Sequence, residues 1–119
     1  MIDVSIYYWK DSKWLREIGM KENPTYPTID QVKEEYVKLP ISLKIEKNST
    51  GELEKIFIKM NLDDNPMGTR EMQQWIRDHD LTHTSMSCGD IIGVPIKGEK
   101  KAIYVCEDAG FSEIFEGIV

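Results

Sequence analysis

Apolar and polar residues alternate in two segments of the first half of the chain. Residues 2–8 carry apolar or aromatic side chains at every second position, and residues 41–45 repeat the pattern in a shorter run. A period of two places successive side chains on opposite faces of a strand, so both segments are predicted to be half-buried strands. Two later apolar runs, 91–96 and 102–106, flank a short glycine-containing turn and predict a β-hairpin.

Three other segments have the spacing of amphipathic helices. Thr28 and Ser49 are each followed three residues later by Gln or Glu, which is the pattern of a capping box. The first cap predicts a helix over about 29–37, and the second predicts one whose apolar side chains recur at intervals of three and four. The local run 55–60 also alternates like a strand, but the cap and the longer periodicity favour the helix. Thr69 is the expected cap of a third helix.

The order of these elements predicts an α+β fold. Strands near both ends of the chain, with helices between them, indicate one mostly antiparallel sheet of about four strands, with two to three helices packed on one face. A chain of 119 residues fits a single domain over 1–119 and is long enough to bury a core without a metal or a disulfide. Closely spaced prolines predict a loop over 21–27.

Composition removes several functions. The net charge is −6, and the longest basic block is Lys100-Lys101, so direct binding to nucleic acid is not expected. An acidic surface can instead meet a basic partner. The sequence shows neither a signal peptide nor an apolar run of membrane-spanning length, which predicts a cytoplasmic protein without membrane contact. Cys88 and Cys106 are too few for a disulfide scaffold and are expected to be buried, reduced thiols.

Most of the candidate chemistry lies in residues 79–94. His79, His83, Cys88 and Cys106 are residue types that bind zinc, but no tight Cys-x2-Cys pair accompanies them. On a continued third helix, His79 would share the apolar face and pack there. We therefore expect no metal and no cofactor. Residues 63–65 are acidic or amide side chains without calcium-loop spacing, and they are expected to form a solvated loop.

A nucleophile could be sought among Ser85, Ser87 and Cys88, with His83 as base and Asp90 as the group that orients it. These residues are close in sequence, whereas catalytic triads are usually assembled from distant segments. Short polar side chains before Gly89 and an apolar run are typical of an ordered turn that leads into a strand. The favoured interpretation is structural, with Ser85, Ser87 and Asp90 bonding to backbone N–H groups.

Aromatic side chains crowd the N-terminal strand. In a half-buried strand, alternate residues point to opposite faces, so Tyr7 or Trp9 could form a patch for a partner. Core packing is the favoured alternative. The candidate binding residues are therefore His83, Ser85, Ser87, Asp90, Tyr7 and Trp9, and no residue is assigned a catalytic role.

One segment resembles a known group of proteins. Residues 83–92 read HTSMSCGDII, which is similar to a Ser-Met-Ser-Val-Gly-Asp-Val-Val segment in small proteins of phages, plasmids and other mobile elements, with the YodL-like domain as the nearest named relative. Those proteins continue into a strand hairpin and a Gly-Phe or Gly-Trp pair, matched here by 104–106 and 110–111. Upstream they carry a Phe-x-x-Met/Phe-Asn helix end, matched by 57–61. Cys88 departs from the pattern, which has valine there.

The resemblance covers about half of the chain, roughly residues 53–114, and it implies no enzymatic role. What it implies is a small accessory protein of a mobile element that acts by binding a host or element-encoded protein, for example as an inhibitor. Two alternatives remain open. One is a small-molecule or nucleotide binder that uses the loop at His83, Ser85, Ser87 and Asp90. The other is a minor enzyme built on the same loop. The sequence does not indicate an oligomeric state.

Overall fold

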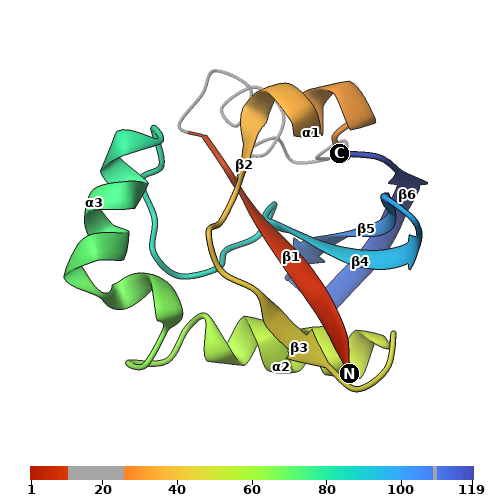
Figure 1. The fold of residues 1–119 in the computed structure, drawn as a ribbon, viewed down its shortest axis with the longest axis horizontal. Helices are drawn as coiled ribbons and strands as arrows, with labels where there is room; N and C mark the ends of the chain where they lie inside the picture. Colours follow the sequence, from red (N-terminus) through yellow and green to blue (C-terminus); the bar gives the residue numbers. More distant parts are fainter. Residues whose placement is uncertain (11–25, 109) are drawn as a thin grey trace.

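The computed structural model describes residues 1–10, 26–108 and 110–119. It forms an α+β domain with one sheet and three helices (Figure 1). In chain order the elements are β1 (Ile2–Trp9), α1 (Ile29–Glu35), β2 (Tyr36–Lys38), β3 (Leu43–Ile45), α2 (Thr50–Lys59), a 3-10 turn η2 (Pro66–Gly68), α3 (Arg70–Asp78), β4 (Ile91–Lys97), β5 (Lys100–Glu107) and β6 (Gly110–Gly117). The loop predicted over 21–27 falls mostly outside the described residues.

The first strand of the chain lies inside the sheet. The strand order is β2-β1-β4-β5-β6, and β3 pairs with the N-terminal half of β1. All the pairings are antiparallel. Tyr7 is opposite Ile91 in the β1–β4 ladder, so the N-terminal strand pairs with a strand from the last third of the chain in the middle of the sheet. The predicted hairpin is confirmed as β4 and β5, and Gly98 in its turn has a φ of 58°.

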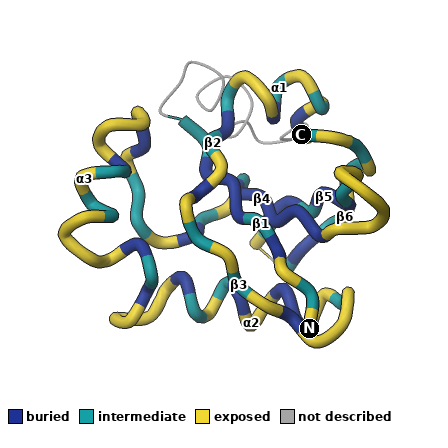
Figure 2. Tube along the Cα trace, viewed as in Figure 1, coloured by how far each residue is buried: buried dark blue, intermediate teal, exposed yellow. Residues whose placement is uncertain are grey.

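Both faces of the sheet are apolar. One face forms the larger core, in which Ile6, Tyr8 and Ile92 pack against the buried sides of α2 and α3. The intervening positions, such as Tyr7 and Ile91, point to the other face and pack with Val32 of α1. Figure 2 shows buried segments along the central strands and exposed positions along the outer sides of the helices. The predicted α+β fold, with two to three helices packed on one face of the sheet, is confirmed by α2 and α3, and α1 covers the opposite face, because that face is apolar too and has to be shielded from water.

The predicted helix starts are confirmed. Thr28 forms the full capping box with Gln31, and the side chains of Ser49 and Thr69 accept from backbone N–H groups of α2 and α3. At α2 only half of the box is present, because the Glu52 carboxylate accepts from the backbone of Glu46 instead.

Two strands were not predicted. The first helix ends at Glu35, two residues short of the expected boundary, since residues 36–38 pair with β1 as β2. The β6 strand was not recognised in the sequence because it contains a bulge. Phe115 is opposite Ile103 and Glu113 is opposite Tyr104, so Ile114 is an extra residue. This extra residue breaks the alternation by which a strand is recognised in sequence. Within the described residues, no helix is long and apolar enough to cross a membrane.

Candidate functional site

Asp90, the residue before β4, is a carboxylate with no exposed surface. One of its oxygens accepts from the backbone N–H of Trp9 at 3.2 Å, and the other accepts from the backbone N–H of Ser87 at 2.8 Å. The Ser87 hydroxyl lies 3.3 Å away, and His83 Nε2 lies 2.9 Å and 3.0 Å from the two oxygens. Polar groups of the described residues thus contact both oxygens of this carboxylate.

The His83 ring is held between two aromatic rings of β1. Its centroid lies 4.4 Å from that of Tyr8 and 4.3 Å from that of Trp9, with interplanar angles of 16° and 26°. The Tyr8 hydroxyl donates to the carbonyl of Thr84 at 2.8 Å, which fixes the loop to the strand. We call the five residues Tyr8, Trp9, His83, Ser87 and Asp90 the Asp90 cluster. The imidazole thus stacks on two aromatic rings while its Nε2 contacts the Asp90 carboxylate.

Burial sets the electrostatics of this cluster. It raises the pKa of Asp90, and hydrogen bonds from His83, Ser87 and Trp9 act in the opposite direction. Burial also raises the pKa of Tyr8 and of Tyr36, with a further contribution from the charge of Asp90. Both phenols are therefore neutral hydrogen-bond donors at ordinary pH.

Side chains from other elements fix the rest of the loop. The amide of Asn65 donates to Met60 O at 2.6 Å and to Thr84 O at 3.1 Å, and the Tyr36 hydroxyl donates to Gly89 O at 2.5 Å. Gly89 has a φ of 95°, a conformation that glycine adopts without steric cost. The loop that leads into β4 is thus anchored at several points along its length.

This arrangement does not provide a nucleophile and base. The Ser87 hydroxyl bonds to Asp90 and not to the imidazole, and Ser85 is exposed, with no hydrogen bond to any described residue. Nδ1 of His83 is buried and has no partner among the described residues. The geometry supports the structural interpretation for Asp90 and Ser87, since the carboxylate accepts from two backbone N–H groups. The geometry does not support a structural role for Ser85.

His79 lies apart from this cluster. The third helix ends at Asp78, and His79 is its exposed C-cap, with its ring stacked on Trp75 at 4.0 Å. The predicted packing of His79 beside Trp75 is confirmed, but the predicted continuation of the helix is wrong, because the chain turns at Asp80, which has a φ of 60°. Among the described residues, no group of three His, Cys, Asp or Glu side chains could hold a metal ion.

The acidic loop at 63–65 divides into two parts. Asp63 and Asp64 are exposed, and Asp64 pairs with Lys59 at 2.5 Å, as a solvated loop would. Asn65 is buried and bonds to the backbone of Met67 and Thr84, so the expectation of a solvated loop is wrong for this residue. The residues around Asn65 in the sequence gave no indication that its side chain is buried and bonded to the backbone.

The N-terminal aromatic residues are divided between the two faces of the sheet: Tyr7 and Trp9 pack with the cluster on the α1 side, and Tyr8 belongs to the larger core. Tyr7 is buried on the α1 side of the sheet, where its hydroxyl lies 2.8 Å from Lys101 Nζ. Trp9 belongs to the Asp90 cluster. Of the candidate binding residues, the structure brings together Trp9, His83, Ser87 and Asp90, and it leaves Tyr7 and Ser85 elsewhere. Tyr8 was not among the candidate binding residues, although the alternation along the strand placed it on the opposite face from Tyr7.

Both cysteines are free thiols. Cys106 is buried, and burial raises its pKa to about 12. Cys88 is exposed, contrary to expectation, and its sulfur lies 3.1 Å from a carboxylate oxygen of Asp108. This carboxylate raises the pKa of Cys88. A raised pKa keeps a thiol protonated, whereas the thiolate is the reactive form. Neither thiol is therefore activated as a nucleophile.

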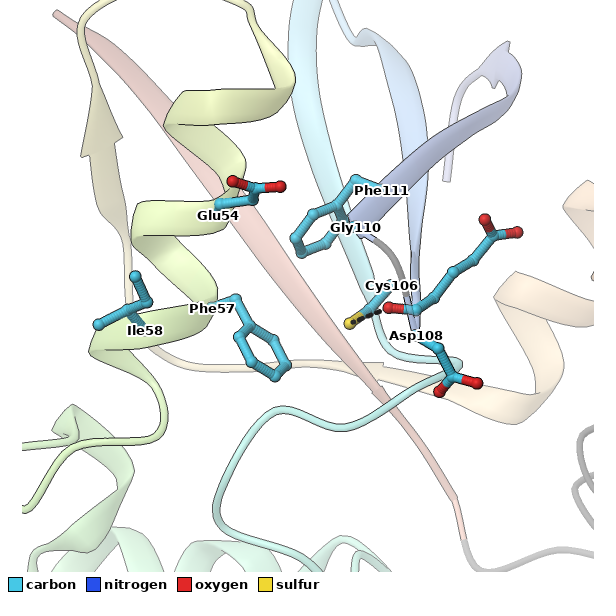
Figure 3. A pocket seen from close by; sticks show the side chains of 8 residues that line it. Glu54, Phe57, Ile58, Cys106, Asp108, Gly110 and Phe111 are labelled. Carbon is cyan, nitrogen blue, oxygen red and sulfur yellow. Dashed lines mark hydrogen bonds between the residues drawn. The ribbon is translucent and has the colours of Figure 1, made fainter.

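A groove lies between α2 and the turn from β5 to β6 (Figure 3). Its volume is about 280 Å³, and we call it the α2–β6 groove. It is lined by Glu54, Phe57, Ile58, Cys106, Glu107, Asp108, Gly110 and Phe111. Ile58 is 56% exposed, and Leu62, four residues later, is 53% exposed. The sequence contained one signal for this groove, which is the isoleucine at position 58 on the side of α2 that points away from the core.

Comparison of the chain with protein-family models, curated proteins and solved structures gave no match. The resemblance to mobile-element proteins therefore stays a prediction.

Proposed function

We propose that the protein acts by binding another protein through the α2–β6 groove, without catalysis. The observation that carries this proposal is the contrast between two parts of the molecule. In the loop before β4, the buried Asp90 carboxylate accepts hydrogen bonds from the protein's own groups, whereas the groove leaves Ile58 and part of Phe57 open to solvent. Large apolar side chains beside a hollow are the usual anchors of a protein interface.

The biological setting proposed from the sequence pattern agrees with this activity. A small accessory protein of a phage or other mobile element, working in the host cytoplasm, would act by occupying a surface of a host or element-encoded protein. The absence of an activated nucleophile among the described residues removes one reason to prefer the enzyme alternative.

The small-molecule alternative is less favoured by the groove. Its rim carries Glu54, Glu107 and Asp108, which would repel the phosphates of a nucleotide. The groove is lined by a helix and a turn at the surface, and Ile58 in that lining is more than half exposed. Pockets for small molecules usually bury most of the ligand.

The proposal is tested by selecting peptides from a displayed random library on the immobilised protein. Selected peptides should lose binding to an Ile58→Glu variant, which places a charge in the apolar part of the groove. The matched control is Ile96→Glu, because Ile96 is 47% exposed but lies on the β4–β5 hairpin, and this variant should bind like the wild type. Peptides that bind all three proteins equally would exclude the groove as the binding surface.

A further inference from the structure

The rim of the α2–β6 groove is acidic on both of its sides. Glu54 comes from α2, and Glu107 and Asp108 come from the end of β5 and the turn after it. In Figure 3, Glu54 lies on one side of the hollow and Asp108 on the other, with the Phe57 and Phe111 rings between them. The groove therefore combines an apolar floor with negative charge at two opposite edges.

These three carboxylates have no cationic partner among the described residues. The two lysines of α2 point elsewhere, since Lys55 pairs with Glu52 at 2.8 Å and Lys59 pairs with Asp64 at 2.5 Å. Glu107 accepts hydrogen bonds from the hydroxyls of Tyr26 and Ser112, and Asp108 accepts one from the Cys88 thiol, but these donors are uncharged. Within the described part of the chain, no cation offsets the negative charge of the rim.

The spacing of the carboxylates is unsuited to a single cation. No three acidic, histidine or cysteine side chains of the described residues approach closely enough to hold a metal ion. Positive charge that matches this rim must therefore be spread over several groups. Lysine and arginine side chains on one polypeptide segment meet this requirement, and their aliphatic stems also suit an apolar lining.

Resting on the proposed function, we infer that the groove takes a basic segment of the partner protein, in which a large apolar side chain is flanked by lysine or arginine. The apolar side chain fills the hollow between Phe57 and Phe111. The flanking cations lie against Glu54 on one side and Asp108 on the other. The net charge of −6 adds a long-range attraction that favours the same class of partner.

The test uses two synthetic peptides with the same leucine and phenylalanine positions, one with lysine flanks and the other with glutamate flanks. Binding is measured by fluorescence anisotropy with the full chain, and the contact surface is mapped by NMR. The lysine peptide should bind and perturb Phe57, Ile58 and Phe111, whereas the glutamate peptide should not. Raising the salt concentration should weaken the binding, because solvent-exposed charges are screened.

Removal of the rim charges separates their effect from that of the overall charge. The double variant Glu54→Gln/Asp108→Asn should bind the lysine peptide about fivefold more weakly at low salt. Glu34→Gln/Glu99→Gln removes the same number of exposed carboxylates away from the groove and should leave binding nearly unchanged. Equal losses in the two variants would show a general charge effect and overturn the inference.

The remaining outcomes distinguish this inference from the proposed function. If both peptides bind with equal affinity and both lose binding to Ile58→Glu, the groove is a protein-binding site but its preference for basic segments is wrong. If the library selection yields groove-binding peptides without basic residues, the same conclusion follows. If the lysine peptide fails to bind, or binds Ile58→Glu as well as the wild type, the inference is overturned.

Discussion

At the scale of single residues, Asp90 shows how a buried carboxylate is accommodated. Its neighbours donate from two backbone N–H groups, a hydroxyl and an imidazole, and one of these donors, the N–H group of Trp9, belongs to a segment far away in the sequence. Burial without such partners would be costly, because a charged or polar group loses its hydration. The side chain therefore joins the start of β4 to the end of β1.

Replacing Asp90 with alanine should destabilise the fold. The change leaves the N–H groups of Trp9 and Ser87 without an acceptor, and it should lower the free energy of unfolding by about 1–3 kcal/mol. Urea unfolding measures the change, and Asp63→Ala at an exposed position is the control, with an expected change near zero. Peptide binding at the groove should persist under conditions where the variant is folded. Unchanged stability with lost binding would make Asp90 a site residue instead.

The titration of Asp90 should have a midpoint above its ordinary pKa of 3.8, because burial raises the pKa. A raised value in the folded state means that the folded protein holds this proton more tightly than the unfolded chain does. The stability that this group contributes is therefore complete below about pH 4 and is lost as the pH rises through the raised pKa. Carbon NMR of the carboxyl group measures the midpoint. A midpoint below 3.8 would show that the hydrogen bonds outweigh burial.

Part of the site could be predicted from the sequence at this scale. Short polar residues before Gly89 and an apolar run indicated the ordered turn, and Asp90 does accept from local backbone. The placement of His83 between Tyr8 and Trp9 could not be predicted, since it depends on the pairing of β1 with β4. The groove was missed for a similar reason, because its two sides come from α2 and β6, and β6 was not recognised.

At the scale of elements, helix starts followed their capping residues, whereas strand limits depended on distant partners. Thr28, Ser49 and Thr69 each accept from the first turn of the helix that they precede, which is a local interaction readable from sequence. The residues of β2 carried no comparable signal, and they form a strand only because β1 lies beside them. Local chemistry thus specified the helices better than the edges of the sheet.

Two glycine substitutions should have opposite effects within these elements. Gly51 lies in the first turn of α2 with open space around it, so Gly51→Ala should stabilise the protein by about 0.5–1 kcal/mol through a smaller entropy loss on folding. Gly93 lies in β4, where an added Cβ would be 3.2 Å from the Tyr7 ring and 3.1 Å from Lys101. Because those two side chains are hydrogen-bonded to each other, Gly93→Ala should destabilise by about 1–3 kcal/mol. Thermal unfolding of both variants measures the difference, and equal shifts would contradict it.

At the scale of the whole molecule, the sheet ends at β6, whose outer edge has no partner strand among the described residues. An open edge can pair with a second copy of the chain. The bulge at Ile114 and the exposed side chains of Glu113 and Glu116 are features that discourage such pairing. The groove, which Gly110 and Phe111 help to line, thus lies beside an edge whose features would disfavour self-association.

Removing that protection should promote self-association. The double variant Glu113→Thr/Glu116→Thr replaces both charges with a residue that favours strands, and it should sediment as larger species than the wild type at the same concentration. Glu34→Thr/Glu99→Thr changes the net charge equally at sites away from the edge and is the control. Identical sedimentation of the two double variants would show that the edge charges have no such role.

The position of β1 inside the sheet also affects how the chain folds during synthesis. This strand is synthesised before its neighbour β4, which begins only at residue 91. Until then Ile6, Tyr7 and Tyr8, which are all buried in the finished sheet, lack the strand that covers them. Pairing between such distant segments also slows folding, because a long loop must close before the contacts form. Pairing of β1 with β4 therefore has to wait until β4 has been synthesised, and the apolar side chains of β1 lack this neighbour until then.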